Sequence, residues 1–258
     1  MEKGYTTNQI GAIATLLGGT IWVLTAYASA DISGWTRIEL GLPILIPLIL
    51  IPLYLMRKRP AFIIGIINSI NGLFMTAFFA SAGGAPHWFE FTQPLLDFSF
   101  VVVIIIILFN IYFSFKTYRE LGAKVHLEPT YTNYQVGAIS TLLAVLIWGI
   151  TSQGFEFQVG IIQPIILVPI AIGWILLPFY FKRDRPAFSF GVGISIIVLI
   201  GFSVTHYLRE EAAIFPSLGE ATPLPIFSAS LYYIISSITY TVIILCMLFS
   251  YLTYKELK

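Results

Sequence analysis

Charged side chains are scarce in this chain. Asp, Glu, Lys and Arg together make up 10% of its 258 residues, whereas they form roughly a quarter of an ordinary soluble domain. This scarcity excludes a water-soluble globular fold, and the 57% of hydrophobic residues places the chain in a lipid bilayer. The formal net charge of +1 provides no basic excess, so we expect no nucleic-acid partner.

Cysteine and histidine are also rare. The single cysteine, Cys246, excludes a disulfide framework or a thiolate metal cluster within one chain. The sequence contains no Walker lysine loop, GxSxG elbow or HExxH pair. Two pairs in the expected outer loops, His87 with Glu90 and His206 with Glu210, have generic spacing, and we interpret them as solvated residues. We therefore expect no enzymatic activity, no cofactor and no metal.

What the chain does contain is an internal repeat. Three matched pairs define it: Tyr5–Ile13 with Tyr131–Ile139, Arg59–Phe62 with Arg185–Phe188, and Thr117–Leu121 with Thr253–Leu257. The first two offsets are 126 (131 − 5 and 185 − 59), and the third is 136 (253 − 117), so 136 − 126 = 10 residues were inserted before the last segment. The repeat predicts a first unit at residues 1–121, a linker at 122–130 and a second unit at 131–258.

Eight stretches are long and apolar enough to cross a bilayer, which takes about 20 residues. They are Gln9–Ala30, Ile38–Met56, Ala61–Ala82, Pro94–Phe115, Gln135–Thr151, Val159–Phe181, Ala187–Thr205 and Ile226–Tyr251. The first is not interpreted as a secretory signal, because the same run recurs deep inside the chain. Four segments per unit give both units the same direction. We predict an all-α integral membrane protein with eight transmembrane helices, arranged as two parallel four-helix repeats.

Basic residues predict the orientation, because cytoplasmic loops retain Lys and Arg. With eight spans, one face carries only Arg37 and Arg209. The other carries the remaining twelve: Lys3, Arg57, Lys58, Arg59, Lys116, Arg119, Lys124, Lys182, Arg183, Arg185, Lys255 and Lys258. We therefore expect a multi-pass protein of the cell membrane with cytoplasmic N- and C-termini. In the longest outer loop, Leu208–Ala213 is predicted to form a short surface helix.

Prolines interrupt the second and sixth segments at matching positions. Pro43 and Pro47 correspond to Pro169 and Gly173 at the 126-residue offset. A proline inside a helix frees a carbonyl group that a neighbour, water or ligand must satisfy in lipid. Transporters use such paired interruptions to build a binding site between repeats, but kinked helices that only pack together would show the same pattern.

Intramembrane polar residues form a second group of candidates. Asn68 and Asn71 lie three residues apart in the third segment, and Asn110 lies in the fourth at a depth where it could reach Asn68. Their repeat counterparts are Ile194, Ile197 and Cys246, so the amides are confined to the first unit. They could line a solute path or serve as hydrogen bonds between helices.

Asp97 is the one carboxylate placed within a predicted span rather than at its edge. Such a residue can relay protons or bind substrate, although water or Arg37 could also satisfy it near the outer interface.

The sequence supports two functions. One is a small-solute or ion permease whose path runs at the repeat interface, between the second and sixth segments. The other is a non-catalytic subunit of a larger respiratory or translocation complex. The expected partners are lipid and further membrane chains, identical or different.

Overall fold

The computed structural model describes residues 4–29, 35–81, 94–123, 131–156, 163–214 and 226–257, with side chains described over 4–24, 45–74, 101–123, 131–150, 168–204 and 236–257. Within these ranges the chain is all-helical and contains no strand beyond one isolated bridge. The helices are α1 (Thr7–Ser29), α2 (Trp35–Leu55), α3 (Arg59–Ser81), α4 (Pro94–Gly122), α5 (Asn133–Glu156), α6 (Gln163–Phe181), α7 (Arg185–Ile214) and α8 (Ile226–Glu256). The predicted all-α class is confirmed.

Capping residues fix where α1 and α5 begin. The backbone N–H of Thr6 donates to Gln9 Oε1 at 3.2 Å, and the N–H of Gln9 donates back to Thr6 Oγ1 at 3.3 Å. Thr132 and Gln135 form the same reciprocal pair ahead of α5, at 3.1 and 3.4 Å. Each pair is a capping box that satisfies two backbone donors otherwise left free at a helix start.

The α2–α3 and α6–α7 connections are tight turns of matching geometry. Arg57 and Arg183 adopt left-handed backbone conformations, with φ of 55° and 58°. The N–H groups of Arg57 and Lys58 donate to the carbonyls of Tyr54 and Leu53, both at 2.9 Å, which is the Schellman pattern that terminates a helix. The next helix then starts with proline in its first turn, where no N–H partner is needed.

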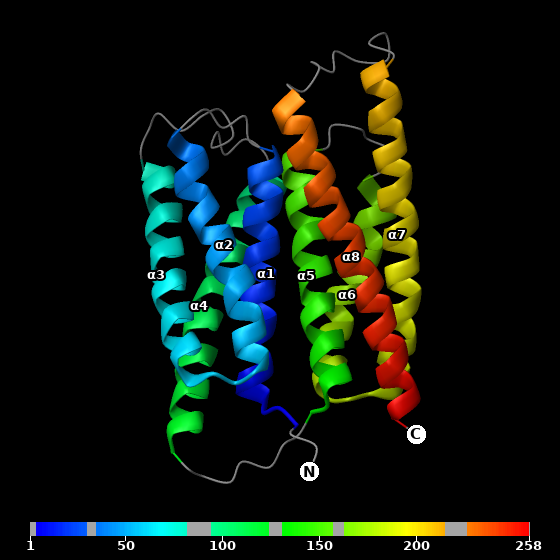
Figure 1. Ribbon diagram of the computed structural model, residues 1–258. Coiled ribbons are helices and arrows are strands. Elements are labelled where there is room, and N and C mark those ends of the chain that lie inside the picture. Colours follow the sequence, from blue (N-terminus) through cyan, green and yellow to red (C-terminus); the bar gives the residue numbers. More distant parts are fainter. Residues whose placement is uncertain are drawn as a thin grey trace.

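The helices form one elongated bundle with α1 and α5 side by side at its centre (Figure 1). The first half, taken as residues up to 123, places α2, α3 and α4 on one side of this pair. The second half, from residue 131, places α6, α7 and α8 on the other. The start of α1 and the end of α8 lie at the same end of the bundle.

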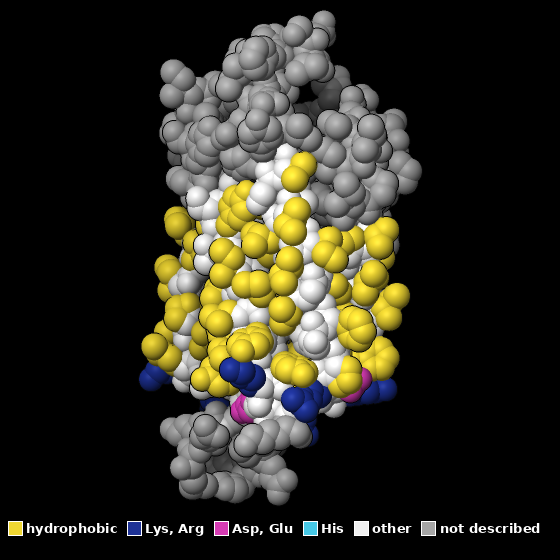
Figure 2. Space-filling model, turned by 90° about the vertical axis from the view of Figure 1, so that its right-hand side faces the viewer, with side chains coloured by type: hydrophobic (Ala, Val, Ile, Leu, Met, Phe, Trp, Pro, Cys, Tyr) yellow, Lys and Arg dark blue, Asp and Glu magenta, His cyan; other side chains and the backbone are white. Residues whose placement is uncertain are grey.

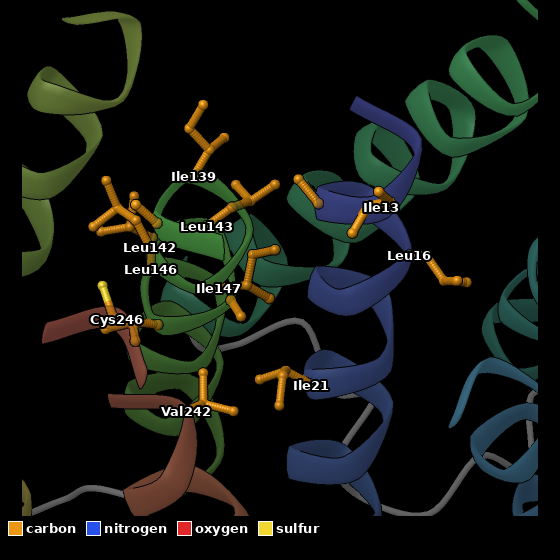
Figure 3. Close-up of a cluster of buried hydrophobic side chains, with 14 of the residues drawn as sticks. Ile13, Leu16, Ile21, Ile139, Leu142, Leu143, Leu146, Ile147, Val242 and Cys246 are labelled. Carbon is orange, nitrogen blue, oxygen red and sulfur yellow. The ribbon is translucent and has the colours of Figure 1, made fainter. Parts of the chain in front are cut away.

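Apolar side chains fill the boundary between α1 and α5. Ile13 and Ile21 from α1 are buried, as are Leu143 and Ile147 from α5 (Figure 3). Close approach is possible because the side chain of Ile147 lies where a Cβ on Gly18 of α1 would project. At the end where α1 begins, Tyr5 and Tyr131 exchange backbone hydrogen bonds in both directions, at 2.7 and 3.1 Å. The two halves therefore share one continuous hydrophobic core.

The outer surface has the character of a membrane protein. In the described residues, four helices have stretches long and apolar enough to cross a bilayer: Val101–Gly122, Asn133–Ile150, Arg185–Val204 and Ser236–Glu256. Figure 2 shows an exposed apolar band bordered at its lower edge by Lys and Arg side chains. We call this border the basic end; it comprises Arg57, Lys58, Arg59, Lys116, Arg119, Lys182, Arg183, Arg185 and Lys255.

One predicted element differs from the structure. Residues Leu208–Ala213 do not form a separate surface helix, because α7 continues without a break to Ile214. The run Leu-Arg-Glu-Glu-Ala-Ala contains good helix formers and no glycine or proline, so nothing in it stops the preceding helix. The apolar segment ends near Thr205, but the helix does not.

Candidate functional site

A buried hydroxyl pair joins α2 to α4 in the first half. The hydroxyl of Tyr54 lies 2.9 Å from Ser114 Oγ, and both side chains are fully buried. The Tyr54 ring stacks on Phe62 of α3 with centroids 4.1 Å apart. The same hydroxyl occupies the space where a Cβ on Gly65 would project. One tyrosine therefore fixes the packing of three helices.

The second half contains the same arrangement. Tyr180 lies 2.9 Å from Ser250 Oγ, its ring is 4.2 Å from that of Phe188, and its hydroxyl fills the space beside Gly191. At the basic end, Arg59 Nε and Arg185 Nε each donate to a tyrosine carbonyl at 3.3 Å. Contacts that are present in both halves are best explained as stabilising the fold. A function specific to one half is expected at positions where the two halves differ.

Removing the serine hydroxyl tests this structural role. Ser114→Ala and Ser250→Ala should each lower the free energy of unfolding by about 1–3 kcal/mol, because a buried tyrosine hydroxyl loses its partner. Thr241→Ala is the control, since Thr241 is exposed on α8 and bonds only the carbonyl of Ser237 in its own helix. Denaturant titration of the purified protein in detergent measures the difference. Equal stability of all three variants would contradict the role assigned to the pair.

Asn110 occupies a buried site among α1, α3 and α4. Its Nδ2 donates to the carbonyl of Ala12 and to Thr15 Oγ1, both at 3.0 Å, while its Oδ1 accepts from Ser69 Oγ at 2.9 Å. The side chain is 2% exposed. The amide thus has partners on both of its polar atoms, which favours the interpretation as a hydrogen-bond link between helices. It meets Ser69, the residue after Asn68, rather than Asn68 itself.

Cys246 stands at the corresponding site of the second half. Its thiol faces the hydroxyls of Ser195, Thr141 and Ser250, and the first two of these are the repeat counterparts of Ser69 and Thr15. The surrounding hydroxyls are therefore shared by the halves, whereas the central amide is replaced by a fully buried thiol.

Asn68 and Asn71, expected on one face of a helix, have different surroundings. Asn68 is half-buried, and its Oδ1 is enclosed without a hydrogen-bond partner among the described residues. Asn71 is exposed on the outer side of α3, between Ile67 and Phe74, which are 61% and 72% exposed. Asn71 therefore does not line the interior of the bundle.

The remaining sequence candidates divide into described and undescribed positions. The side chains of Asp97 in α4 and Pro43 in α2 lie outside the described residues. Pro47 and Pro169 are buried within α2 and α6. Gly173 is buried too, and the side chain of Leu146 from α5 fills the space beside it. Gly173 thus serves helix packing.

The predicted path between the second and sixth segments does not match the arrangement of the helices. α2 packs against α1 and α3, while α6 packs against α5 and α7. α1 and α5 lie between them and form the boundary of the two halves (Figure 1). Because that boundary is lined by the apolar side chains described above, Pro47 and Gly173 do not face a common polar space within the described region.

No protein-family model, curated protein or solved structure matches the chain. What the molecule does is therefore inferred from its own residues.

Sequence reasoning missed Thr15, Ser69, Tyr54 and Ser114 as partners in buried hydrogen bonds. Their signal was present in the repeat: Thr15, Ser69 and Tyr54 recur 126 residues on as Thr141, Ser195 and Tyr180, and Ser114 recurs 136 residues on as Ser250.

Proposed function

We propose that the chain is a non-catalytic membrane subunit that works in contact with other membrane-spanning helices. Its architecture in this proposal is two parallel four-helix repeats with eight spans and with both termini in the cytoplasm. The matched caps, turns and tyrosine–serine pairs of the two halves support the repeats. The basic end supports the orientation, because Lys and Arg concentrate on the cytoplasmic side of membrane proteins.

The exposed amide of Asn71 is the observation that carries the functional proposal. A primary amide in hydrocarbon without a hydrogen-bond partner costs several kcal/mol, and polar residues that face outward at this depth pair with another helix. The second half has Ile197 at the matching position, 48% exposed, which is what a purely lipid-facing site contains. The fold therefore does not require an amide at this position. An amide here is instead explained by a hydrogen bond between Asn71 and a residue outside the chain.

Purification in a mild detergent tests the subunit role. We expect a particle whose protein mass exceeds that of one chain, measured by native mass spectrometry or light scattering. Asn71→Ile should shift the population toward single chains, because it gives the first half the residue that the second half already has. A lone, monodisperse chain obtained from native membranes would contradict the proposal.

A permease is the second candidate, and one observation favours it. The Oδ1 atom of Asn68 is buried without a partner among the described residues, as expected where a passing solute or a water completes the hydrogen bonding. The path would then run inside the first half rather than at the repeat boundary. Solute and ion flux in liposomes, compared between the wild-type protein and Asn68→Ile, distinguishes the two functions. Flux that depends on Asn68 supports the permease, and the absence of flux supports the subunit.

A further inference from the structure

Asn71 lies near the middle of the membrane on an otherwise apolar helix face. It follows Arg59, at the basic end, by 71 − 59 = 12 residues, which places it about 18 Å along the helix axis at 1.5 Å per residue. The hydrocarbon core is about 30 Å thick, so neither water nor lipid headgroups reach this depth from either side. Its neighbours on the face, Ile67 and Phe74, offer no hydrogen bond.

The second half shows what this face contains when it meets only lipid. On α7 the counterparts of Asn71 and Phe74 are Ile197 and Ile200, exposed by 48% and 58%. Both faces point outward from the same bundle, so they share geometry and environment. The α7 face carries Gly193 in place of Ile67 and Ile197 in place of Asn71, so at the depth of Asn71 only the α3 face presents a polar side chain. That amide marks the α3 face for a partner.

We propose that this partner is a second copy of the chain, bound through the α3 face about a two-fold axis near Asn71. A primary amide has both donor and acceptor groups, so two asparagines facing each other can satisfy one another. In a two-fold interface a residue at the axis meets itself, and two-fold dimers are the commonest oligomers. A single buried asparagine in an apolar seam is a known means of fixing such pairing. This inference rests on the proposed subunit role, because it names the partner.

Cysteine cross-linking in native membranes tests the pairing. Phe74→Cys places a thiol on the α3 face, and Ile200→Cys places one at the matching position of α7, which is also exposed. The unmodified chain is a further control, because its one cysteine, Cys246, is buried. Under mild oxidation, Phe74→Cys should give a product of twice the chain mass, and Ile200→Cys should not.

The amide itself is tested in the same assay. Adding Asn71→Ile to Phe74→Cys should reduce the cross-linked fraction about tenfold, because the interhelical amide hydrogen bonds are lost. Adding Asn71→Gln, which keeps the amide, should retain most of it. Under conditions in which both are single chains, thermal unfolding of the Asn71→Ile chain should equal that of the wild type, which separates loss of pairing from loss of folding.

The outcomes separate the pairing from the subunit role. A product joined to a protein of different mass would overturn the second copy as partner and leave the subunit role standing. Equal cross-linking from α3 and α7 would indicate random collision and overturn the pairing. Absence of any cross-linked product would overturn the pairing as well. The subunit role would still be tested independently by the mass of the detergent-solubilised particle.

Discussion

Gly191→Ala is expected to lower the free energy of unfolding by about 3 kcal/mol. A Cβ at this position would overlap the hydroxyl of Tyr180. That hydroxyl cannot move away cheaply, because it is bonded to Ser250 at 2.9 Å and its ring is packed against Phe188. The variant therefore combines overpacking, at about 1–3 kcal/mol, with the loss of a buried hydrogen bond, at about 1–3 kcal/mol.

Gly193 provides a matched control two residues along the same helix. A Cβ built there meets no atom within 4 Å, so Gly193→Ala should leave stability unchanged or raise it by up to about 1 kcal/mol, as alanine favours a helix. Gly65→Ala should reproduce the loss in the first half through Tyr54. Denaturant titrations give the free energy of unfolding of the three variants. Equal values for Gly191→Ala and Gly193→Ala would show that a Cβ beside Tyr180 causes no strain.

Asn110→Leu is expected to destabilise the fold by about 2 kcal/mol, since interhelical hydrogen bonds within membranes contribute roughly 0.6–2 kcal/mol each. The change removes the links from α4 to Ala12, Thr15 and Ser69. Thr15 keeps its bond to the carbonyl of Gly11 at 2.6 Å, and the carbonyl of Ala12 keeps the Thr15 hydroxyl at 3.3 Å, so the loss is concentrated on Ser69. Leucine restores apolar volume but no polar partner.

Asn71→Ile is the contrasting variant, because it replaces the same residue type at a similar depth. It should leave the unfolding of the single chain unaltered, since its amide makes no hydrogen bond within the described part of the molecule. The two variants together separate a hydrogen bond that holds the fold from one that serves association. If Asn110→Leu unfolded like the wild type and Asn71→Ile were the unstable one, these roles would have to be exchanged.

The sequence predicted the helical class and the positions of the helices well. Caps and breakers explain this success: Thr6 with Gln9, and proline after Arg59 and Arg185, mark helix starts in the chain itself. The end of α7 was predicted too early, because a loss of hydrophobicity was taken as the loss of helix. Membrane crossing of all eight segments stays a prediction, and the repeat arrangement is a proposal that the matched contacts support.

The candidate site was harder to predict, because spacing along one helix does not determine which side faces the protein. Asn68 and Asn71 share a helix at close spacing, yet one is half-buried and the other exposed. Only the packing of α3 against its neighbours decides this. Likewise, the matching interruptions at Pro47 and Gly173 suggested a shared site, but α1 and α5 separate their helices. Gly173 serves close packing with Leu146, a role that depends on a side chain from another helix.

Thiol accessibility from the two sides of the membrane tests the parallel eight-span arrangement most directly. Lys58 and Asp184 occupy matching turns, since 184 − 58 = 126, and Glu156 ends α5 at the opposite end of the bundle. In intact cells, an impermeant reagent should label Glu156→Cys and leave Lys58→Cys and Asp184→Cys unlabelled until the membrane is opened. Labelling of Lys58→Cys and Asp184→Cys from opposite sides would contradict parallel repeats, and labelling of both from outside would contradict the orientation.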